Sequence, residues 1–347
     1  MSALQRAVQS EALDQQELAQ ALRDTARHMR AAWPDVMEEA APSVAVILPC
    51  HNEGGTIGAV IAAFAAALPA ARIIVFDNAS SDDTAMRASE AGAEVYFEKR
   101  KGKGNVVRRM FADIEADIYL MADGDGTYDA ASAPRLIRMI AEDGCDMAVG
   151  ARQNVHSDAH RNGHAIGNKL FNKLYGTLFG AEFGDIFSGY RAFSRRFVKS
   201  FPALSSGFEI ETELSVHAGA LKLPTGEIDL PYGKRPEGST SKLRTFRDGW
   251  RILRTFGFLL KETRPALFFG LPAALLCGLS LLLATPLLFT WLETGLVPRL
   301  PTALFCVGLM LASGLLATSG LILDSLARSR VEQKRILYLA ISATRLR

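Results

Sequence analysis

The chain has 347 residues, enough for one sizeable domain with additions. Its formal net charge is +2, so the composition indicates no polyanionic partner, and we expect no nucleic-acid ligand. The four cysteines, Cys50, Cys145, Cys277 and Cys306, lack the spacing of a metal site, and we expect free thiols in a reducing compartment rather than disulfides.

Residues 1–42 form a polar stretch in which apolar side chains recur at near-helical spacing and prolines follow. We expect a helix that rests on the main domain, and the residues leave a regulatory or partner-binding role open. No basic and then apolar leader opens the chain, so we expect no cleaved signal peptide.

From Val44 onward, short apolar runs alternate with longer stretches of helical pattern. The runs predict strands over 44–48, 73–76, 94–97, 118–121 and 147–149, and helices beginning near Thr56, Asp82, Asn105 and Ala131. Such alternation is typical of an α/β fold with a mostly parallel sheet and helices on both faces. Ligands of such sheets bind beyond the carboxyl ends of the strands, so the polar loops at that edge form the candidate site.

Two of these loops follow the first and second predicted strands. The first contains Pro49, Asn52 and Glu53, and the second begins with Asp77. Asn52 and Glu53 could simply cap the next helix. Asp77, directly after a buried strand, is better placed to accept hydrogen bonds from a base or ribose.

The next loop is basic and contains Lys103 and Gly104 at the expected start of a helix. Backbone N–H groups and ammonium groups at such a place can bind phosphate. A solvated basic loop is the alternative.

An acidic loop, with Asp123 and Asp125 among glycines, follows the fourth predicted strand. Paired carboxylates suit Mg²⁺ or Mn²⁺ that carries a diphosphate, because Mg²⁺ usually shares its shell with water and substrate phosphates. A plain turn is the alternative, since Asp and Gly are common in turns. A calcium loop of the EF-hand type fits worse, because its Gly and Glu positions fall on Tyr128 and Pro134.

Eight motifs occur in order along this part of the chain. The first four are Pro49-x-x-Asn52-Glu53, Asp77-Asn78-x-Ser80-x-Asp82-x-Thr84, Gly102-Lys103-Gly104 and Asp123-x-Asp125. The second four are Val149-Gly150-Ala151-Arg152, Asp185-Ile186-Phe187-Ser188-Gly189-Tyr190-Arg191-Ala192-Phe193, Gly207-Phe208-Glu209-Ile210-Glu211-Thr212-Glu213 and Arg235-x-x-Gly238-Ser239-x-Ser241-Lys242-Leu243.

With these motifs, residues 44–262 resemble inverting family 2 glycosyltransferases of the GT-A fold. The second set narrows the resemblance to polyprenyl-phosphate glycosyltransferases, such as dolichyl-phosphate mannose synthase and bactoprenol glucosyltransferases. One departure is His51, since many relatives have an aromatic residue such as Tyr there.

The resemblance implies transfer of a sugar from a UDP- or GDP-hexose to undecaprenyl or dolichyl phosphate, with Mg²⁺ or Mn²⁺ as cofactor. In this interpretation Asp123 and Asp125 hold the metal and act in catalysis. The donor-binding residues are Pro49, Asn52, Glu53, Asp77, Lys103, Gly104 and Asp123. Arg152 is the first candidate for the acceptor phosphate and Arg235 for the diphosphate or acceptor region. Further candidates are Arg161, His164, Arg191 and Lys242.

Asp185, in the element that continues to Arg191, is the third predicted catalytic residue. It could orient the acceptor or sugar, act as a base, or form a salt bridge to Arg191. Three glutamates follow at alternate positions, which places them on one strand face or scatters them on a helix. Of these, Glu209 and Glu211 are expected to support the acceptor-side loops.

Two uncharged apolar stretches, 265–291 and about 302–323, are each long enough to span a hydrocarbon core of about 30 Å. Buried core helices are the alternative. Basic residues flank both outer ends, so we expect a multi-pass protein of the cell (inner) membrane whose catalytic domain faces the cytoplasm. Residues 242–264 combine an apolar stripe with an arginine face, which indicates a helix on anionic headgroups; a coupling helix is the alternative.

The expected domains are an N-terminal helical extension (1–42), a GT-A domain (43–241), an amphipathic juxtamembrane helix (242–264), two transmembrane helices (265–325) and a basic cytoplasmic tail (326–347). A processive polysaccharide synthase is disfavoured because the Gln-x-x-Arg-Trp element is absent. A sugar-phosphate nucleotidyltransferase is disfavoured as well, because it would need a Gly-rich pyrophosphorylase loop after the first strand and residues 49–55 do not supply one. A glycosyltransferase with another lipid or glycan acceptor and a membrane scaffold without activity stay open, as does a homo-oligomer.

Overall fold

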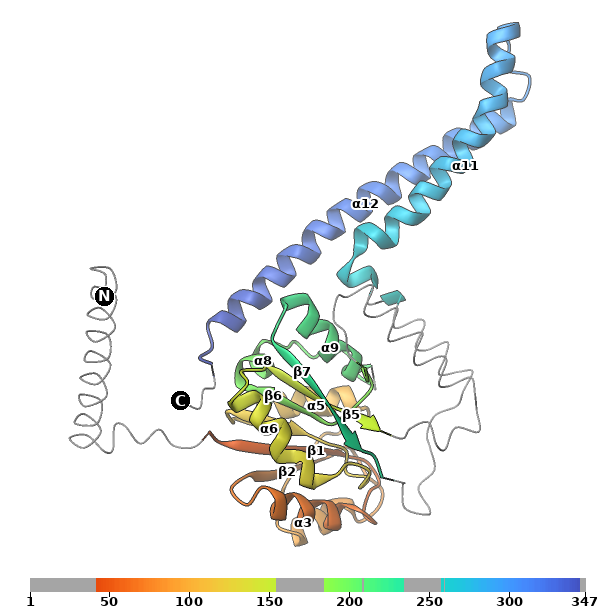
Figure 1. Ribbon diagram of the computed structural model, residues 1–347. Coiled ribbons are helices and arrows are strands. Elements are labelled where there is room, and N and C mark those ends of the chain that lie inside the picture. The colour runs from red at the N-terminus through yellow and green to blue at the C-terminus, as the bar shows by residue number, and fades with distance from the viewer. Residues whose placement is uncertain (1–41, 154–183, 208, 234–256, 259, 344–347) are drawn as a thin grey trace, which may run out of the picture. The chain divides into compact units, whose positions relative to one another are not determined.

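The structure is a computed structural model that describes residues 42–153, 184–207, 209–233, 257–258 and 260–343 (Figure 1). Its strands are β1 (Val44–Cys50), β2 (Arg72–Asp77), β3 (Glu94–Phe97), β4 (Ile118–Met121), β5 (Met147–Gln153), β6 (Arg191–Ser194) and β7 (Thr225–Pro231). Its helices are α3 (Ile57–Ala67), α4 (Thr84–Glu90), α5 (Lys103–Asp113), the 3₁₀ turn η1 (Ala130–Ser132), α6 (Ala133–Ala141), α8 (Arg195–Ser200), α9 (Ile210–Leu221), α11 (Pro265–Thr294) and α12 (Leu300–Leu339).

The strands form one sheet in the order β3-β2-β1-β4-β6-β5-β7. Strand β6 pairs antiparallel with β4 and β5, and the other neighbours are parallel. The mostly parallel α/β fold predicted from the sequence is therefore confirmed. The apolar runs of β3 and β4 were predicted to the residue, and β1, β2 and β5 extend a little beyond the prediction.

Helices cover both faces of the sheet, as Figure 1 shows for α3 on one face and α5 and α9 on the other. Alternate residues of β1 enter two separate cores: Ala45 and Ile47 pack with α5 and α9, while Val46 and Leu48 pack with α3 and α6. A strand buried on both faces must be apolar at every position, which explains the uninterrupted runs in the sequence. The carboxyl ends of β1, β2 and β4 then present their loops along one edge.

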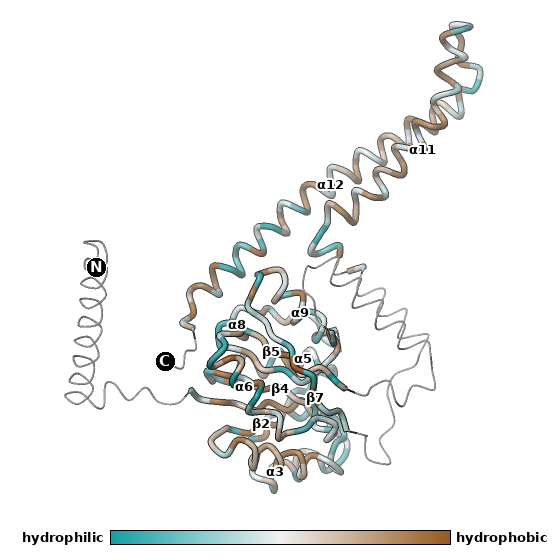
Figure 2. Tube along the Cα trace, viewed as in Figure 1, coloured by the Kyte–Doolittle hydropathy of each residue, from teal (hydrophilic) through white to brown (hydrophobic). Residues whose placement is uncertain are grey.

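Helices α11 and α12 are long and apolar enough to cross a membrane, and Figure 2 shows the many hydrophobic residues along both. Only 11% and 17% of their most apolar windows are buried, which argues against core helices of a soluble domain. They pack on each other through small residues: Ser280 donates a hydrogen bond to the carbonyl of Cys306, and Ser313 donates one to that of Ala273, both at 2.8 Å. Small polar residues of this kind are common where membrane helices meet.

Helix α12 continues beyond the predicted end of the second span. The sequence placed a separate tail at 326–347, whereas the helix runs to Leu339. Near its end the hydroxyl of Tyr338 donates to Asp146 Oδ2 at 2.6 Å, and Arg335 Nη1 donates to the carbonyl of Leu221 at 2.6 Å. The ring of Tyr338 belongs to the core of the α/β domain, so this part of the predicted tail is an anchored helix end.

Residues 1–41 and most of the predicted juxtamembrane helix lie outside the described residues. Of that helix, 257–258 and 260–263 are described and are helical. Glu262 there forms an ion pair with Arg330 of α12 at 2.6 Å.

Candidate active site at the carboxyl edge of the sheet

The acidic loop after β4 is held in shape by its own side chains. Asp125 Oδ1 accepts hydrogen bonds from the backbone N–H and hydroxyl of Thr127, at 3.2 and 2.6 Å. Gly124 lies so close to Glu53 that a Cβ there would come within 2.5 Å of Glu53 Oε2. Thr56 donates a hydrogen bond to the carbonyl of Gly124 at 2.7 Å. The loops after β1 and β4 therefore form one packed unit.

Lys103 is the first residue of α5 and extends to the acidic loop. Its Nζ lies 2.5 Å from Asp123 Oδ1 and 2.7 Å from Glu211 Oε1 of α9. Burial alone would lower the pKa of Lys103, but the charges of Asp123 and Glu211 outweigh that effect and raise its pKa well above the usual value. The side chain is 9% exposed, against 28% for Asp123, so Asp123 is the member of this group that solvent and ligands reach.

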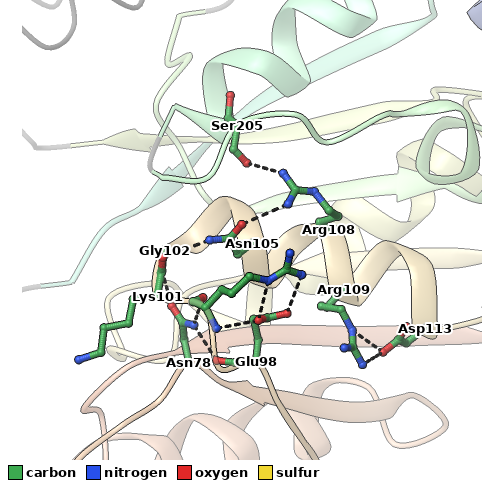
Figure 3. Close-up of polar contacts among 10 residues, drawn as sticks. Asn78, Glu98, Lys101, Gly102, Asn105, Arg108, Arg109, Asp113 and Ser205 are labelled. Atoms are coloured by element: carbon green, nitrogen blue, oxygen red, sulfur yellow. Dashed lines mark hydrogen bonds and ion pairs between the residues drawn. The ribbon is translucent and has the colours of Figure 1, made fainter.

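The backbone of the basic loop is engaged within the protein. The N–H of Gly102 donates to Asn78 Oδ1 at 2.7 Å, as Figure 3 shows, and the N–H of Gly104 donates to the carbonyl of Gly207 at 3.1 Å. A Cβ at Gly102 or Gly104 would also collide with the backbone of residues 205–206. The Gly104 N–H is therefore already engaged by the 203–207 segment, and the donor-binding role of Lys103 and Gly104 stays a prediction.

The loops after β1 and β2 are bonded to each other. Asn52 Oδ1 accepts from the N–H of Ser81 at 2.7 Å, and the N–H of Glu53 donates to Thr84 Oγ1 at 2.8 Å. The Asn52 side chain is bonded to the second loop and the N-cap residue of α3 is Thr56, so the capping alternative is wrong for Asn52. Asp77 is 4% exposed, and its Oδ1 has no hydrogen-bond partner among the described residues. An unpaired buried oxygen is costly, so Asp77 is a good acceptor for a ligand hydroxyl or N–H group.

Arg152 and Asp185 form a two-pronged ion pair. Arg152 Nε and Nη2 lie 2.6 and 2.9 Å from the two oxygens of Asp185. Burial alone would raise the pKa of Asp185, but the hydrogen bonds and charge of Arg152 hold it below the usual value. The guanidinium also lies over the ring of Tyr232, 5.5 Å from its centroid. One sequence interpretation was a salt bridge from Asp185 to Arg191. In the structure Asp185 pairs with Arg152 instead.

Arg191 corrects a second expectation. It is 0% exposed, and its guanidinium donates to the carbonyls of Ser188 and Ile186 and to the hydroxyl of Ser215, each at 2.8 Å. A fully buried group with these partners cannot meet an acceptor phosphate at the edge of the sheet. Arg191 instead joins the Ser-Gly-Tyr turn to α9.

Comparison with known proteins identifies the class of this site. The family model for "Glycosyl transferase family 2" matches residues 45–201. "Glycosyltransferase AglJ" of Haloferax volcanii is 31% identical over 296 residues, which is 85% of this chain and 97% of AglJ. The chain belongs to glycosyltransferase family 2. "Protein RfbJ" of Shigella flexneri is 56% identical over 111 residues, 32% of this chain and 86% of RfbJ.

Solved structures show that this glycosyltransferase has the GT-A fold. Glucosyl-3-phosphoglycerate synthase from Mycobacterium tuberculosis, in complex with Mn²⁺, UDP and glucosyl-3-phosphoglycerate, superposes with a TM-score of 0.53 at 22% identity, covering 64% of this chain and 80% of that one. Mannosyl-3-phosphoglycerate synthase from Rubrobacter xylanophilus gives a TM-score of 0.51 at 24% identity over 63% and 74% of the two chains. At these identities the likeness concerns the fold.

The candidate metal ligands of this glycosyltransferase fit a divalent cation whose remaining coordination positions are filled by the substrate. In the described part of the chain no group of three or more His, Cys, Asp or Glu side chains gathers as metal ligands. Asp123 and Asp125 would supply two carboxylates from one loop. Two carboxylates with the rest of the shell left to phosphates and water suit Mg²⁺ or Mn²⁺.

The sequence analysis gave no role to two residues of this region, Glu213 and Tyr128. Glu213 accepts hydrogen bonds from the N–H groups of Leu204 and Ser205. Glu211, which was expected to support the acceptor-side loops, contacts Lys103. The hydroxyl of Tyr128 accepts from the N–H of Gly189 at 2.9 Å. Arg161, His164, Arg235 and Lys242 lie outside the described residues.

Proposed function

We propose that this glycosyltransferase moves a hexose from a UDP- or GDP-sugar to a membrane polyprenyl phosphate, undecaprenyl or dolichyl, with inversion at the anomeric carbon. The observation that carries the proposal is the pair α11 and α12, whose apolar side chains are largely uncovered on the same chain as a GT-A domain. Uncovered apolar helices of this length favour a bilayer. An enzyme so attached is suited to an acceptor that is itself held in lipid.

The donor would bind along the loops after β1, β2 and β4. Asp77, with its unpaired buried oxygen, is assigned to the base or ribose, and Pro49, Asn52 and Glu53 form the wall beside it. Asp123 and Asp125 would hold Mg²⁺ or Mn²⁺, a choice supported by the solved relative that contains Mn²⁺ and UDP. When bound, the cation neutralises the charge that develops on the departing nucleoside diphosphate.

The acceptor phosphate needs no strong base, because a phosphate monoester is already anionic near neutral pH. A phosphate oxygen would form the new bond to the anomeric carbon while the electron pair of the old bond leaves with the diphosphate. Asp185 occupies the Nε–Nη2 fork of Arg152, and the remaining N–H donors at Nη1 and Nη2 are assigned to the acceptor phosphate. Asp185 fixes that fork and stays ionised, which makes it a positioning residue for Arg152.

The orientation in the membrane follows from charge. Basic residues flank the outer ends of both apolar stretches, and the connector between them contains only Glu293 and Arg299 as charged side chains. By the positive-inside rule the GT-A domain would lie on the cytoplasmic side of the inner membrane.

The test is transfer from a panel of radiolabelled UDP- and GDP-sugars to undecaprenyl and dolichyl phosphate, with the full chain in detergent and Mg²⁺ or Mn²⁺. A lipid-extractable product from one donor is expected, and it should be absent with Asp125→Asn. Transfer to a water-soluble acceptor or another glycan would reject the polyprenyl phosphate and keep the family. Silence with every donor, from protein that binds no nucleotide, would favour a scaffold.

A further inference from the structure

A buried lysine lies between two carboxylates, one of which belongs to the acidic loop after β4. Lys103 Nζ contacts Asp123, a proposed metal ligand, and Glu211, which belongs to the first turn of α9. We propose that Glu211 is a positioning residue for the metal site: it retains the Lys103 ammonium when Asp123 turns from that ammonium to a divalent cation. The proposal rests on the proposed function, since it assumes that Asp123 binds Mg²⁺ or Mn²⁺.

The surroundings of Glu211 indicate that its carboxylate serves to bind a cation. Glu211 is 4% exposed, and its Oε1 lies 2.7 Å from Lys103 Nζ. Its buried Oε2 has no hydrogen-bond partner among the described residues. A buried carboxylate is costly unless a cation compensates it. Lys103 is the cation that does so here, which means that Glu211 and Asp123 share one positive charge.

Gly189 closes the other side of the ammonium. A Cβ at this position would lie 2.9 Å from Lys103 Nζ and 3.0 Å from Asp123 Oδ2. The Lys103 ammonium is therefore confined between Glu211, Asp123 and the backbone of the Ser-Gly-Tyr turn. This confinement explains why residue 189 is a glycine: any larger side chain would occupy the space in which Lys103 meets Asp123.

The shared charge has a consequence for metal binding. A divalent cation at Asp123 competes with Lys103 for the same carboxylate and is repelled by the ammonium. While Glu211 is ionised, the ammonium keeps a partner after Asp123 leaves it. With glutamine at 211 the ammonium would depend on Asp123 alone, and the site would lose one negative charge. Both changes weaken binding of the cation.

The experiment measures binding of Mn²⁺ to the full chain in detergent by electron paramagnetic resonance of free Mn²⁺, alone and with UDP or GDP, and needs no turnover. For Glu211→Gln we expect the Mn²⁺ dissociation constant to rise by about tenfold, because the variant loses a buried negative charge that is separated from Asp123 only by the Lys103 ammonium. In transfer assays the Mn²⁺ concentration for half-maximal rate should rise in parallel, with little change of kcat at saturating metal.

The matched control is Glu213→Gln, the same change in the same turn of α9. Glu213 accepts from the N–H groups of Leu204 and Ser205, at 2.9 and 2.8 Å, and its described contacts do not include Lys103. Its Mn²⁺ affinity should stay at the wild-type value. Glu211→Asp is a second variant that keeps the negative charge but draws the carboxylate back from the ammonium by one methylene, so its Mn²⁺ affinity should lie between those of the wild type and Glu211→Gln.

The outcomes separate the two proposals. If the wild-type chain binds no Mn²⁺ with either UDP or GDP, the metal assignment in the proposed function fails, and this inference fails with it. If the wild type binds Mn²⁺ and Glu211→Gln binds it equally well, the inference alone is overturned. A loss of UDP-sugar affinity in Glu211→Gln with unchanged Mn²⁺ affinity would likewise overturn it and assign Glu211 to the sugar. Should Glu211→Gln fold poorly, Glu211→Asp decides the question, and a wild-type Mn²⁺ affinity in that variant overturns the inference.

Discussion

Removing the hydroxyl of Tyr338 should release the end of α12 from the GT-A domain. This hydroxyl donates to Asp146 Oδ2 at 2.6 Å, with Tyr338 6% exposed and Asp146 0% exposed. Arg196 binds the same carboxylate through two nitrogens, at 2.6 and 3.0 Å, and lies over the Tyr338 ring at 4.7 Å from its centroid. Tyr338→Phe removes one hydrogen bond from this cluster and keeps the ring.

The size of the effect follows from that geometry. A buried hydrogen bond to a carboxylate contributes about 1.5–3 kcal/mol. Asp146 keeps its bonds from Ser194 and Arg196 in the variant, so the carboxylate is not orphaned and the lower end of that range applies. A loss of about 1.5 kcal/mol raises the detached fraction of the helix end by about tenfold.

The assay is the rate of trypsin cleavage after Lys334 and Arg335 in nanodiscs, followed by mass spectrometry. Cleavage requires the helix end to detach, because Arg335 donates a hydrogen bond to the carbonyl of Leu221 at 2.6 Å. When opening is fast relative to cleavage, the rate follows the detached fraction, and it should rise about tenfold. Tyr96→Phe is the control, since Tyr96 stacks on Phe76 and its hydroxyl makes no hydrogen bond to the described residues. A wild-type rate in Tyr338→Phe would refute the anchor.

Three further predictions concern the site and the core. Asp125→Ala should abolish transfer with little loss of folding, measured by turnover and circular dichroism; an active, metal-dependent variant would remove it from its role. Arg152→Ala should raise the KM for polyprenyl phosphate at least about tenfold and leave the donor KM nearly unchanged, since one charged hydrogen-bond pair is lost. Burial, and then the charge of Lys334, lowers the pKa of His217 to about 3. Because unfolded histidine binds a proton below about pH 6.5, stability is complete above that pH and falls by up to about 1.4 kcal/mol per unit between pH 6.5 and 3. In thermal melts, the loss of stability on going from pH 7.5 to pH 5 should be smaller for His217→Gln than for the wild type.

Local patterns were enough for much of the sheet but not for β6. Its sequence, Arg191 to Ser194, is four residues long and begins with a charged side chain, which looks like a functional arginine rather than a buried strand. The strand forms because the guanidinium finds carbonyl and hydroxyl partners inside the protein. Burial of a charge depends on partners distant in sequence, and no periodicity reveals them. Strand β7 was missed for another reason: it is largely polar and only Leu230 is buried.

The candidate site divides in the same way. Asp123 and Asp125 were predictable because both belong to one short loop after a clearly apolar strand. The pairings of Lys103 with Glu211 and of Arg152 with Asp185 join residues on separate elements, and the motifs that contain them do not state which charge meets which. The motifs therefore predicted the residue types at the edge, and the fold decided their partners.

Helix α9 contacts both the side chain that pairs with Asp123 and the end of the apolar helix α12. Its first turn carries Glu211, which contacts Lys103, and the carbonyl of its last residue, Leu221, accepts the hydrogen bond from Arg335 of α12. With 12 residues the helix is about 18 Å long. One helix of the α/β domain therefore makes both the contact to Lys103 beside Asp123 and the contact to the end of α12.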